Sequence, residues 1–158
     1  MINKNPNPCS EQIRHYPVRP FLAVSVAILR EDKVLLILRK EKVYSLPGGV
    51  VELGETLEMA ALRELREEVD LSAELISPLP PVEVILKDEQ GKVSRHMVVM
   101  PFAAHWVGGE AAITQEACKN IWVKPSDIAD LPHTQHLEKT VLCAFRMRDV
   151  VNDKRLRE

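Results

Sequence analysis

The segment GGVVELGETLEMAALRELREEVDL, residues 48–71, constrains the fold more than any other part of the chain. It joins a glycine-rich loop to a pattern of apolar residues that return every three or four positions, which is the period of a helix packed on one side. Thr56 is a suitable N-cap for this helix. The stripe that we expect to pack on a sheet is Leu57, Ala61, Leu62, Leu65 and Val69.

Three carboxylates, Glu64, Glu67 and Glu68, share a neighbouring arc of the same helix. Ala60, one turn earlier on that arc, is expected to leave room for a ligand. Like charges three and four residues apart repel each other by roughly a few tenths of a kcal/mol, which a solvated surface tolerates. A solvated acidic face is therefore one interpretation of the pattern.

The loop before the helix favours a second interpretation, a site for a cation or a phosphate. Gly48, Gly49 and Gly54 are half of the six glycines in the protein, and they allow the backbone to approach a bound ion closely. Glu52 and Glu55 add two further carboxylates to the same loop.

Together these residues resemble the signature of the Nudix family, the Nudix box, written G-x5-E-x7-R-E-U-x-E-E-x-G-U with U a bulky aliphatic residue. Asp70 departs from the pattern, because it stands where the box has glycine. The matching positions are Gly49, Glu55, Arg63, Glu64, Leu65, Glu67, Glu68 and Leu71.

The resemblance implies an α/β (α+β) fold, the Nudix α/β/α sandwich with a mixed β-sheet. We expect the Nudix domain to span residues 20–152 and residues 153–158 to form a C-terminal tail. Residues 1–19 are expected to be an irregular lead, since the first 20 residues hold four of the eleven prolines.

Elsewhere, apolar and β-branched runs predict strands over residues 21–30, 33–40 and 117–123, one strand directly after the box helix, and a hairpin that turns at residues 88–91. We expect Pro101 at an edge or a bulge, because proline lacks an N–H. A short helical turn should begin at Pro125, and a final amphipathic helix at about Thr134.

The resemblance also implies a metal site for Mg²⁺ or Mn²⁺. Its ligands would be the Gly48 carbonyl group and the carboxylates of Glu64, Glu67 and Glu68, since these cations prefer oxygen ligands. Arg63 would orient the carboxylates. Support from the loop would come from Gly49, Glu52, Gly54 and Glu55. Glu64 and Glu116 are both candidates for the catalytic base.

Two further residues are candidates for substrate binding. Arg39 could bind a phosphate through its bidentate guanidinium, although a solvated strand end is the alternative interpretation. Tyr44 is the aromatic residue closest to the loop in sequence, and its ring could stack on a base. Phe102 and Trp106 are the other rings that we would test.

The implied reaction is hydrolysis of the pyrophosphate bond in a nucleoside diphosphate linked to another group. The segment RHMVVMPFAAHWVGGE is similar to the ADP-ribose pyrophosphatase-like subgroup, so ADP-ribose or a related dinucleotide is our first expectation. A nucleoside triphosphate is the nearest competitor. A non-catalytic nucleotide-binding module and an isopentenyl diphosphate isomerase are the rival classes.

Composition restricts the partners and the location. The net charge is −2 with no block of like charges, so we expect a small nucleotide as substrate, no nucleic-acid polymer and no membrane. A homodimer is left open. Cys9, Cys118 and Cys143 are widely spaced and odd in number, and no segment resembles a signal peptide, which together predict a cytoplasmic protein.

Overall fold

The computed structural model describes residues 15–114 and 119–158. Its helices are α1 (Leu57–Glu68), the 3-10 helix η1 (Pro125–Asp130) and α2 (Leu137–Arg157). Its strands are β1 (Phe21–Arg30), β2 (Lys33–Leu38), β3 (Tyr44–Ser45), β4 (Gly48–Val50), β5 (Ser72–Pro78), β6 (Val82–Lys87), β7 (Val93–Gly108) and β8 (Lys119–Val123).

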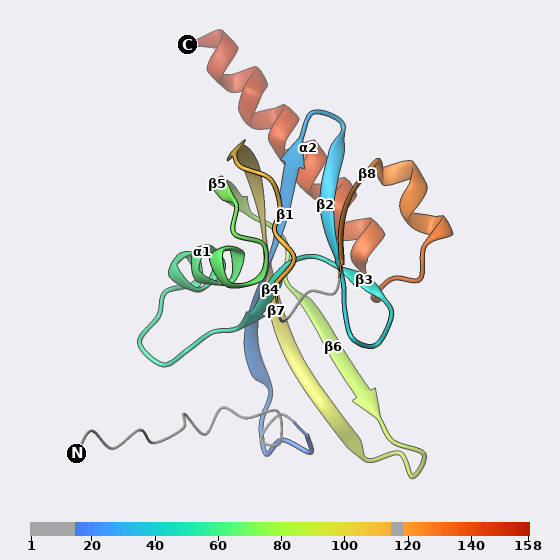
Figure 1. Cartoon of the computed structure of the whole chain (residues 1–158). Helices are drawn as coiled ribbons and strands as arrows, with labels where there is room; N and C mark the ends of the chain where they lie inside the picture. Colours follow the sequence, from blue (N-terminus) through green and yellow to red (C-terminus); the bar gives the residue numbers. More distant parts are fainter. Residues whose placement is uncertain (1–14, 115–118) are drawn as a thin grey trace, which may run out of the picture.

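The strands form one mixed sheet with β1 near its centre (Figure 1). β1 pairs in parallel with β7 and antiparallel with β2 and β4. The edges on the β2 side are β3 and β8. The predicted mixed sheet is therefore confirmed.

Successive side chains of β1 point to opposite faces of the sheet, and apolar side chains on both faces explain why helices cover both. Val24, Val26 and Ile28 belong to the core cluster that includes α1, whereas Ala27 and Leu29 belong to the cluster that includes η1 and α2. Burying one such aliphatic side chain stabilises the fold by about 1.5–3 kcal/mol. Because both sets are buried, α1 lies on one face and α2 on the other, which confirms the predicted α/β/α sandwich.

β7 is unusually long, and its two halves have different antiparallel partners: β6 pairs with the first half and β5 with the second. Pro101 lies on this internal strand and none of the register shifts along it falls at Pro101, so our expectation of an edge or a bulge was wrong. It sits between Val99, the last residue paired with β6, and Phe102, the first paired with β5. Its carbonyl accepts a hydrogen bond from the Leu79 N–H at 2.8 Å, and the gap between partners tolerates a residue without an N–H.

Helix α1 begins as predicted, because the Thr56 hydroxyl accepts a hydrogen bond from the Met59 N–H at 3.1 Å. Two details of its apolar face were wrong. Leu62 is 40% exposed and lies outside the core, whereas Ala60 is fully buried and leaves no room for a ligand. The helix is rotated so that the row Ala60, Glu64 and Glu68 faces the sheet.

The ends of the described chain differ in structure. Residues 15–20 are irregular, and Tyr16 donates its N–H to the Ser94 carbonyl at 2.9 Å and its hydroxyl to Asp88. α2 continues to Arg157, so residues 153–157 are helical. Cys9 and Cys118 lie outside the described residues. None of the described helices has the length and hydropathy needed to cross a bilayer.

Asp70, the one departure from the box, adopts a left-handed backbone with φ of 51° directly after α1. Its N–H donates to the Leu65 carbonyl at 2.9 Å, which closes the helix end. Because glycine adopts this conformation without steric cost, we expect Asp70→Gly to raise the free energy of unfolding by up to about 1 kcal/mol.

Denaturant unfolding would measure this change. The matched control is Asp130→Gly, at a position without positive φ, where added backbone freedom should destabilise the protein instead. Equal destabilisation by both substitutions would contradict the explanation.

Candidate metal-binding and catalytic site

The glycines of the loop allow three chain segments to approach one another closely. β4 pairs with β1, and a Cβ atom on Gly48 would lie 2.1 Å from the Val24 carbonyl oxygen. A Cβ atom on Gly49 would lie 2.3 Å from Glu64 Oε1 on α1. Gly48 therefore needs glycine because rigid backbone lies beside it, whereas a side chain at Gly49 would displace the Glu64 carboxylate. Gly54 needs glycine for its backbone, since its φ is 86°.

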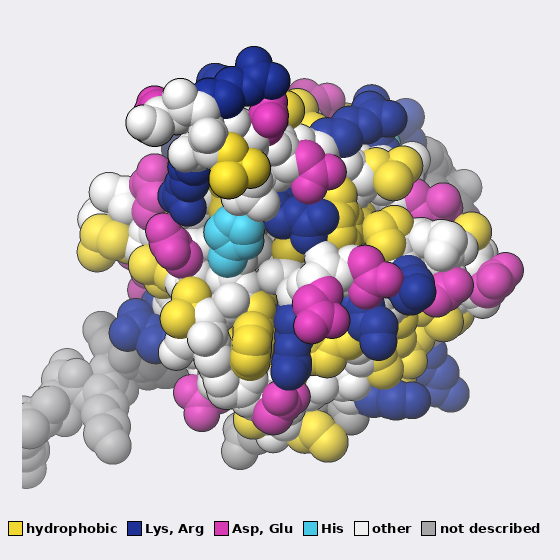
Figure 2. Space-filling model, turned by 90° about the horizontal axis from the view of Figure 1, so that it is seen from above, with side chains coloured by type: hydrophobic (Ala, Val, Ile, Leu, Met, Phe, Trp, Pro, Cys, Tyr) yellow, Lys and Arg dark blue, Asp and Glu magenta, His cyan; other side chains and the backbone are white. Residues whose placement is uncertain are grey.

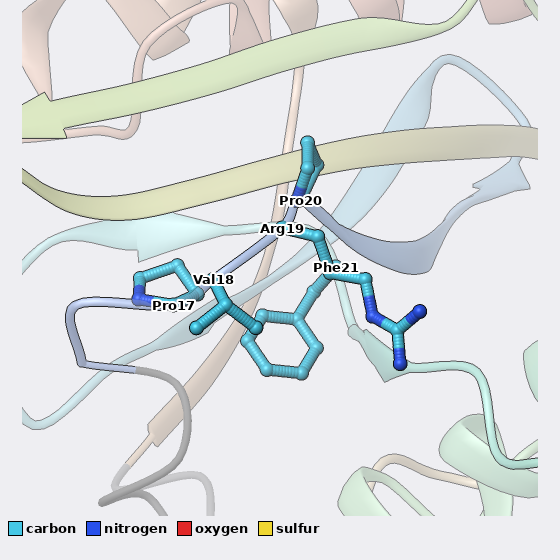
Figure 3. A pocket seen from close by; sticks show the side chains of 5 residues that line it. All are labelled: Pro17, Val18, Arg19, Pro20 and Phe21. Carbon is cyan, nitrogen blue, oxygen red and sulfur yellow. The ribbon is translucent and has the colours of Figure 1, made fainter.

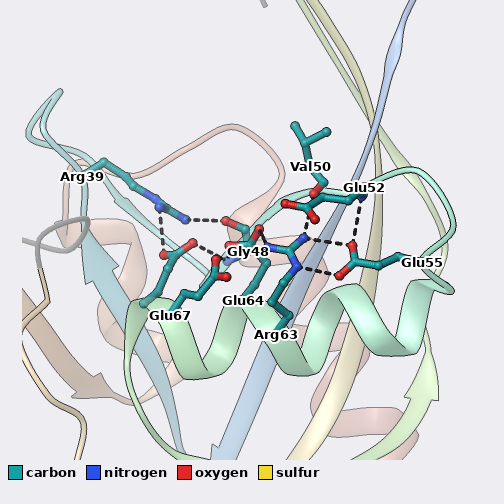
Figure 4. A network of polar contacts seen from close by, with 9 residues as sticks. Arg39, Gly48, Val50, Glu52, Glu55, Arg63, Glu64 and Glu67 are labelled. Atoms are coloured by element: carbon teal, nitrogen blue, oxygen red, sulfur yellow. Dashed lines mark hydrogen bonds and ion pairs between the residues drawn. The ribbon is translucent and has the colours of Figure 1, made fainter. Parts of the chain in front are cut away.

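Arg63 holds the carboxylates of the box together, as Figure 4 shows. Its guanidinium donates to Glu64 Oε1 at 2.8 Å, to Glu67 Oε2 at 3.1 Å and to the Val50 carbonyl at 3.0 Å. Its shortest contact, 2.6 Å, joins Nε to Glu55 Oε1. Arg63 thus links the loop, β4 and two carboxylates of α1.

Glu55 has a supporting position in this network. In addition to the Arg63 contact, its Oε2 accepts a hydrogen bond from the Glu52 N–H at 2.9 Å, which closes the loop on itself. Hydrogen bonding to Arg63 lowers the pKa of the Glu55 carboxyl to about 2. Glu55 is therefore ionised near neutral pH and forms an ion pair with Arg63.

Glu68 is the most deeply buried carboxylate of the cluster, with an exposed fraction of 1%. Its Oε1 accepts a hydrogen bond from the Gly48 N–H at 3.1 Å. Its Oε2 lies 2.9 Å from Arg39 Nη1 but has no aligned hydrogen bond. Burial raises the pKa of the Glu68 carboxyl to about 7, against the opposing charge of Arg39.

Arg39 reaches this carboxylate from the chain segment directly after β2. Besides Glu68, it donates to the Ser45 hydroxyl at 2.8 Å, to the Leu46 carbonyl at 3.1 Å and to the Gly48 carbonyl at 3.4 Å. The Arg39 guanidinium therefore contacts two of the expected metal ligands at once.

The Gly48 carbonyl and the carboxylates of Glu64 and Glu68 are oxygen donors of the kind that a divalent cation binds. The buried Glu68 Oε2 atom faces the Arg39 guanidinium at 2.9 Å, and the missing Cβ of Gly49 lets the Glu64 carboxylate lie against the loop. Hard cations such as Mg²⁺ and Mn²⁺ bind such oxygen atoms. Within the described residues, no three acidic, His or Cys side chains are arranged around one point as a ready-made metal site, and Arg39 and Arg63 are paired with the carboxylates instead.

The remaining candidates occupy different places. Glu67 is half exposed beside Arg63, and Glu116 lies outside the described residues. Tyr44 is only 8% exposed in the core under α2, and its backbone groups bond to Pro132 and Thr134. This burial does not favour the interpretation of Tyr44 as a base platform.

Sequence reasoning missed two polar groups at this site. The Ser45 hydroxyl positions Arg39, and the Thr114 hydroxyl donates to the Glu68 carbonyl at 3.0 Å. Neither lies at a box position, so no spacing pattern could have identified them. Ser45 lies three residues before Gly48, and this proximity in sequence is the only available signal.

A pocket elsewhere contributes nothing to this cluster. Pro17, Val18, Arg19, Pro20 and Phe21 line it at the start of β1 (Figure 3). None of the box carboxylates takes part in its lining. The pocket is therefore separate from the polar network of Figure 4.

Comparisons with known proteins identify a matching family model, related sequences and a related structure. A model of the NUDIX domain matches residues 19–144. The chain is 35% identical over 104 residues to an ADP-ribose pyrophosphatase of Methanocaldococcus jannaschii, a match that covers 63% of this chain and 59% of that protein. It is 30% identical over 115 residues to a MutT-like protein of Streptomyces ambofaciens, covering 70% of each.

A solved structure shows the same fold. The MutT NUDIX hydrolase of Burkholderia pseudomallei superposes with a TM-score of 0.69 at 27% identity, covering 79% of this chain and 98% of that one. In contrast, this chain spans only 59% of the length of the Methanocaldococcus relative.

Gly48 lies against the backbone of β1 and Gly49 against the Glu64 side chain, so substitutions at the two positions should have different consequences. Gly48→Ala should destabilise the protein by about 3 kcal/mol, because its Cβ meets rigid backbone of β1. Gly49→Ala should destabilise it less, since the Glu64 side chain can rotate, but should weaken Mn²⁺ binding. Denaturant unfolding and Mn²⁺ titration followed by electron paramagnetic resonance would measure both effects.

Gly108→Ala is the matched control, because a Cβ atom there meets nothing within 4 Å. It should change neither quantity. Unchanged Mn²⁺ affinity in Gly49→Ala would contradict the position assigned to Glu64.

The Glu55–Arg63 pair predicts a pH dependence of stability. The folded-state pKa of Glu55 is about 2, below its ordinary 4.5, so this carboxylate stabilises the fold fully above pH 4.5 and the effect is lost as the pH falls toward 2. Glu55→Gln should therefore lower Tm at neutral pH, and the difference from the wild type should shrink on acidification.

Calorimetry between about pH 6 and about pH 2.5 would measure this difference. Glu52→Gln, which alters an exposed neighbour in the same loop, is the control. A difference for Glu55→Gln that stays constant over this range would disagree with the ion pair.

Proposed function

Because the chain belongs to the Nudix family, we propose that it is a hydrolase, dependent on Mg²⁺ or Mn²⁺, that cleaves the pyrophosphate bond of a nucleoside diphosphate linked to another group. The observation that carries the proposal is Glu68. Its carboxylate is 1% exposed, and burial raises its pKa to about 7 although Oε1 accepts the Gly48 N–H and Oε2 lies 2.9 Å from the Arg39 guanidinium, so the burial is costly for a structural role alone. The carboxylate is suited to bind a cation.

In this proposal, the metal ligands are the Gly48 carbonyl and the carboxylates of Glu64, Glu67 and Glu68. The bound metal would neutralise the pyrophosphate charge and activate water. Arg63 keeps Glu64 and Glu67 oriented, and the Arg63–Glu55 contact fixes Arg63 itself. Glu64 or Glu116 would take a proton from the attacking water as the leaving phosphate departs.

Arg39 would have a second partner during the reaction. In the structure it neutralises Glu68 at 2.9 Å, and its side chain is 25% exposed. A cation at Glu68 would repel the guanidinium, which would then be available to a substrate phosphate close by. This exchange keeps our expectation that Arg39 binds substrate and adds that metal binding precedes it.

For the substrate, we propose ADP-ribose or a related dinucleotide. The resemblance to the Methanocaldococcus ADP-ribose pyrophosphatase supports it. The interspersed acidic and basic side chains on the face in Figure 2 support a small molecule rather than a nucleic-acid polymer. Stacking by the rings that we considered is poorly supported, since Phe102 is 2% exposed and Arg30 lies over Trp106 at 4.0 Å.

A nucleoside triphosphate is the second candidate, because the Streptomyces relative and the Burkholderia structure are named MutT. A panel of both substrate classes with Mg²⁺ separates the candidates. Release of AMP and ribose 5-phosphate from ADP-ribose at the highest kcat/KM supports the first proposal. Release of pyrophosphate from a triphosphate at a higher kcat/KM would support the second, and no turnover of either class would refute both.

Loss of box carboxylates should abolish activity without loss of the fold. We expect Glu67→Gln and Glu68→Gln to lower kcat by about 100-fold or more and to abolish the rise in Tm that Mg²⁺ gives the wild type. Steady-state kinetics and thermal unfolding with and without Mg²⁺ would measure these effects.

Glu58→Gln, which alters an exposed carboxylate in the first turn of the same helix, is the matched control. It should retain both turnover and the Mg²⁺ effect. Turnover near the wild-type level in both Glu67→Gln and Glu68→Gln would refute the metal site.

A further inference from the structure

Strand β6 forms an exposed edge of the sheet. Within the described part of the chain, β6 pairs only with β7. The hairpin of these two strands projects beyond the layer of helices (Figure 1). Ile85 and Leu86 are each 45% exposed on it. An edge of this length with apolar side chains is a template for pairing with another strand.

The backbone direction along β6 follows from two contacts to β7. The Leu86 carbonyl accepts a hydrogen bond from the Ser94 hydroxyl, and the Asp88 N–H donates to the Lys92 carbonyl. Backbone groups alternate in direction from residue to residue along a strand. Glu83, Ile85 and Lys87 therefore direct their N–H and C=O groups toward the outer edge.

The sequence of β6, VEVILK, is complementary to itself in the antiparallel direction. If Ile85 faces Ile85 of a second copy, Glu83 of each copy lies opposite Lys87 of the other. Val84 of each copy then lies opposite Leu86 of the other. Directly opposite residues share one face of a sheet, so opposite charges would meet on one face and apolar side chains on the other.

The apolar half of this pairing extends an existing surface. Val84 pairs with Met97, and Val82 pairs with Val99, which places these four side chains on the same face as Leu86. All four are only partly buried in the single chain. Pairing across the β6 edge would join two such stripes into one.

We propose that two copies of this chain associate through β6, edge to edge and antiparallel, with a two-fold axis at Ile85. In this closed two-fold arrangement the β6 edge of each copy is paired with that of the other. No β6 edge remains exposed, so association stops at the dimer. The sheet of each copy then continues into the other. This interface lies on a different part of the sheet from the carboxylate cluster and does not depend on the proposed hydrolysis.

Charge exchange across the axis tests the proposal. We expect sedimentation equilibrium of the wild type between about 1 and 200 μM to show a dimer. Glu83→Lys and Lys87→Glu each place like charges opposite each other twice, and should each raise the dimer Kd by about tenfold or more. The double variant Glu83→Lys/Lys87→Glu restores opposite charges and should recover the wild-type Kd.

Glu89→Lys is the matched control, since it makes the same charge change as Glu83→Lys at an exposed position in the turn of the same hairpin. It should leave the Kd unchanged. Circular dichroism and Tm of each variant identify any loss of fold. A monomeric wild type, or single variants that dimerise as tightly as the wild type, would overturn the proposal.

The register has its own test. Opposed residues of a hydrogen-bonded antiparallel pair have Cα atoms about 5.5 Å apart, within the span of about 4.4–6.8 Å that a disulfide bridges. Mild oxidation of Ile85→Cys should give a covalent dimer in excess of the wild type under the same conditions. Val84→Cys should not give this covalent dimer, because Val84 lies opposite Leu86 of the second copy and not opposite its Val84. Cross-linking of Val84→Cys in preference to Ile85→Cys would contradict the axis at Ile85.

Discussion

The burial of the Glu68 carboxylate constrains the rest of the site. Removing a carboxylate from water is costly unless charges or hydrogen bonds compensate. Here the Gly48 N–H and the Arg39 guanidinium compensate in part, at 3.1 and 2.9 Å. This arrangement needs β4 to lie against both β1 and α1, which glycine at positions 48 and 49 allows. The packing of the fold and the chemistry of the site therefore depend on the same close approach.

Two arginines from different elements then set the charge of the cluster. Arg63 on α1 binds Glu55, Glu64 and Glu67, while Arg39 after β2 binds Glu68. Four carboxylates against two guanidinium groups leave an excess of negative charge when all are ionised. In the proposed function, a divalent cation would compensate that excess, and its arrival would release Arg39. In this proposal, Arg63 keeps its carboxylate partners when the metal binds, whereas Arg39 exchanges Glu68 for a substrate phosphate.

Local patterns predicted the scaffold better than the contacts within the site. Helical spacing and the Thr56 cap identified α1, and the box spacing placed Arg63 beside its carboxylates. The same spacing left the rotation of the helix open, so Leu62 and Ala60 were assigned to the wrong environments. The Arg39–Glu68 contact joins residues far apart in sequence. The burial of Tyr44 depends on the loop before α2, and strands as short as β3 and β4 have no periodicity to detect.

The most direct measurement is anomalous diffraction from crystals of the protein soaked in Mn²⁺. We predict an anomalous peak bounded by the Gly48 carbonyl, Glu64 and Glu68, with the Arg39 guanidinium withdrawn from Glu68. Arg39 still in contact with Glu68, together with Mn²⁺ bound elsewhere or not at all, would contradict the assignment of Glu68 as a metal ligand.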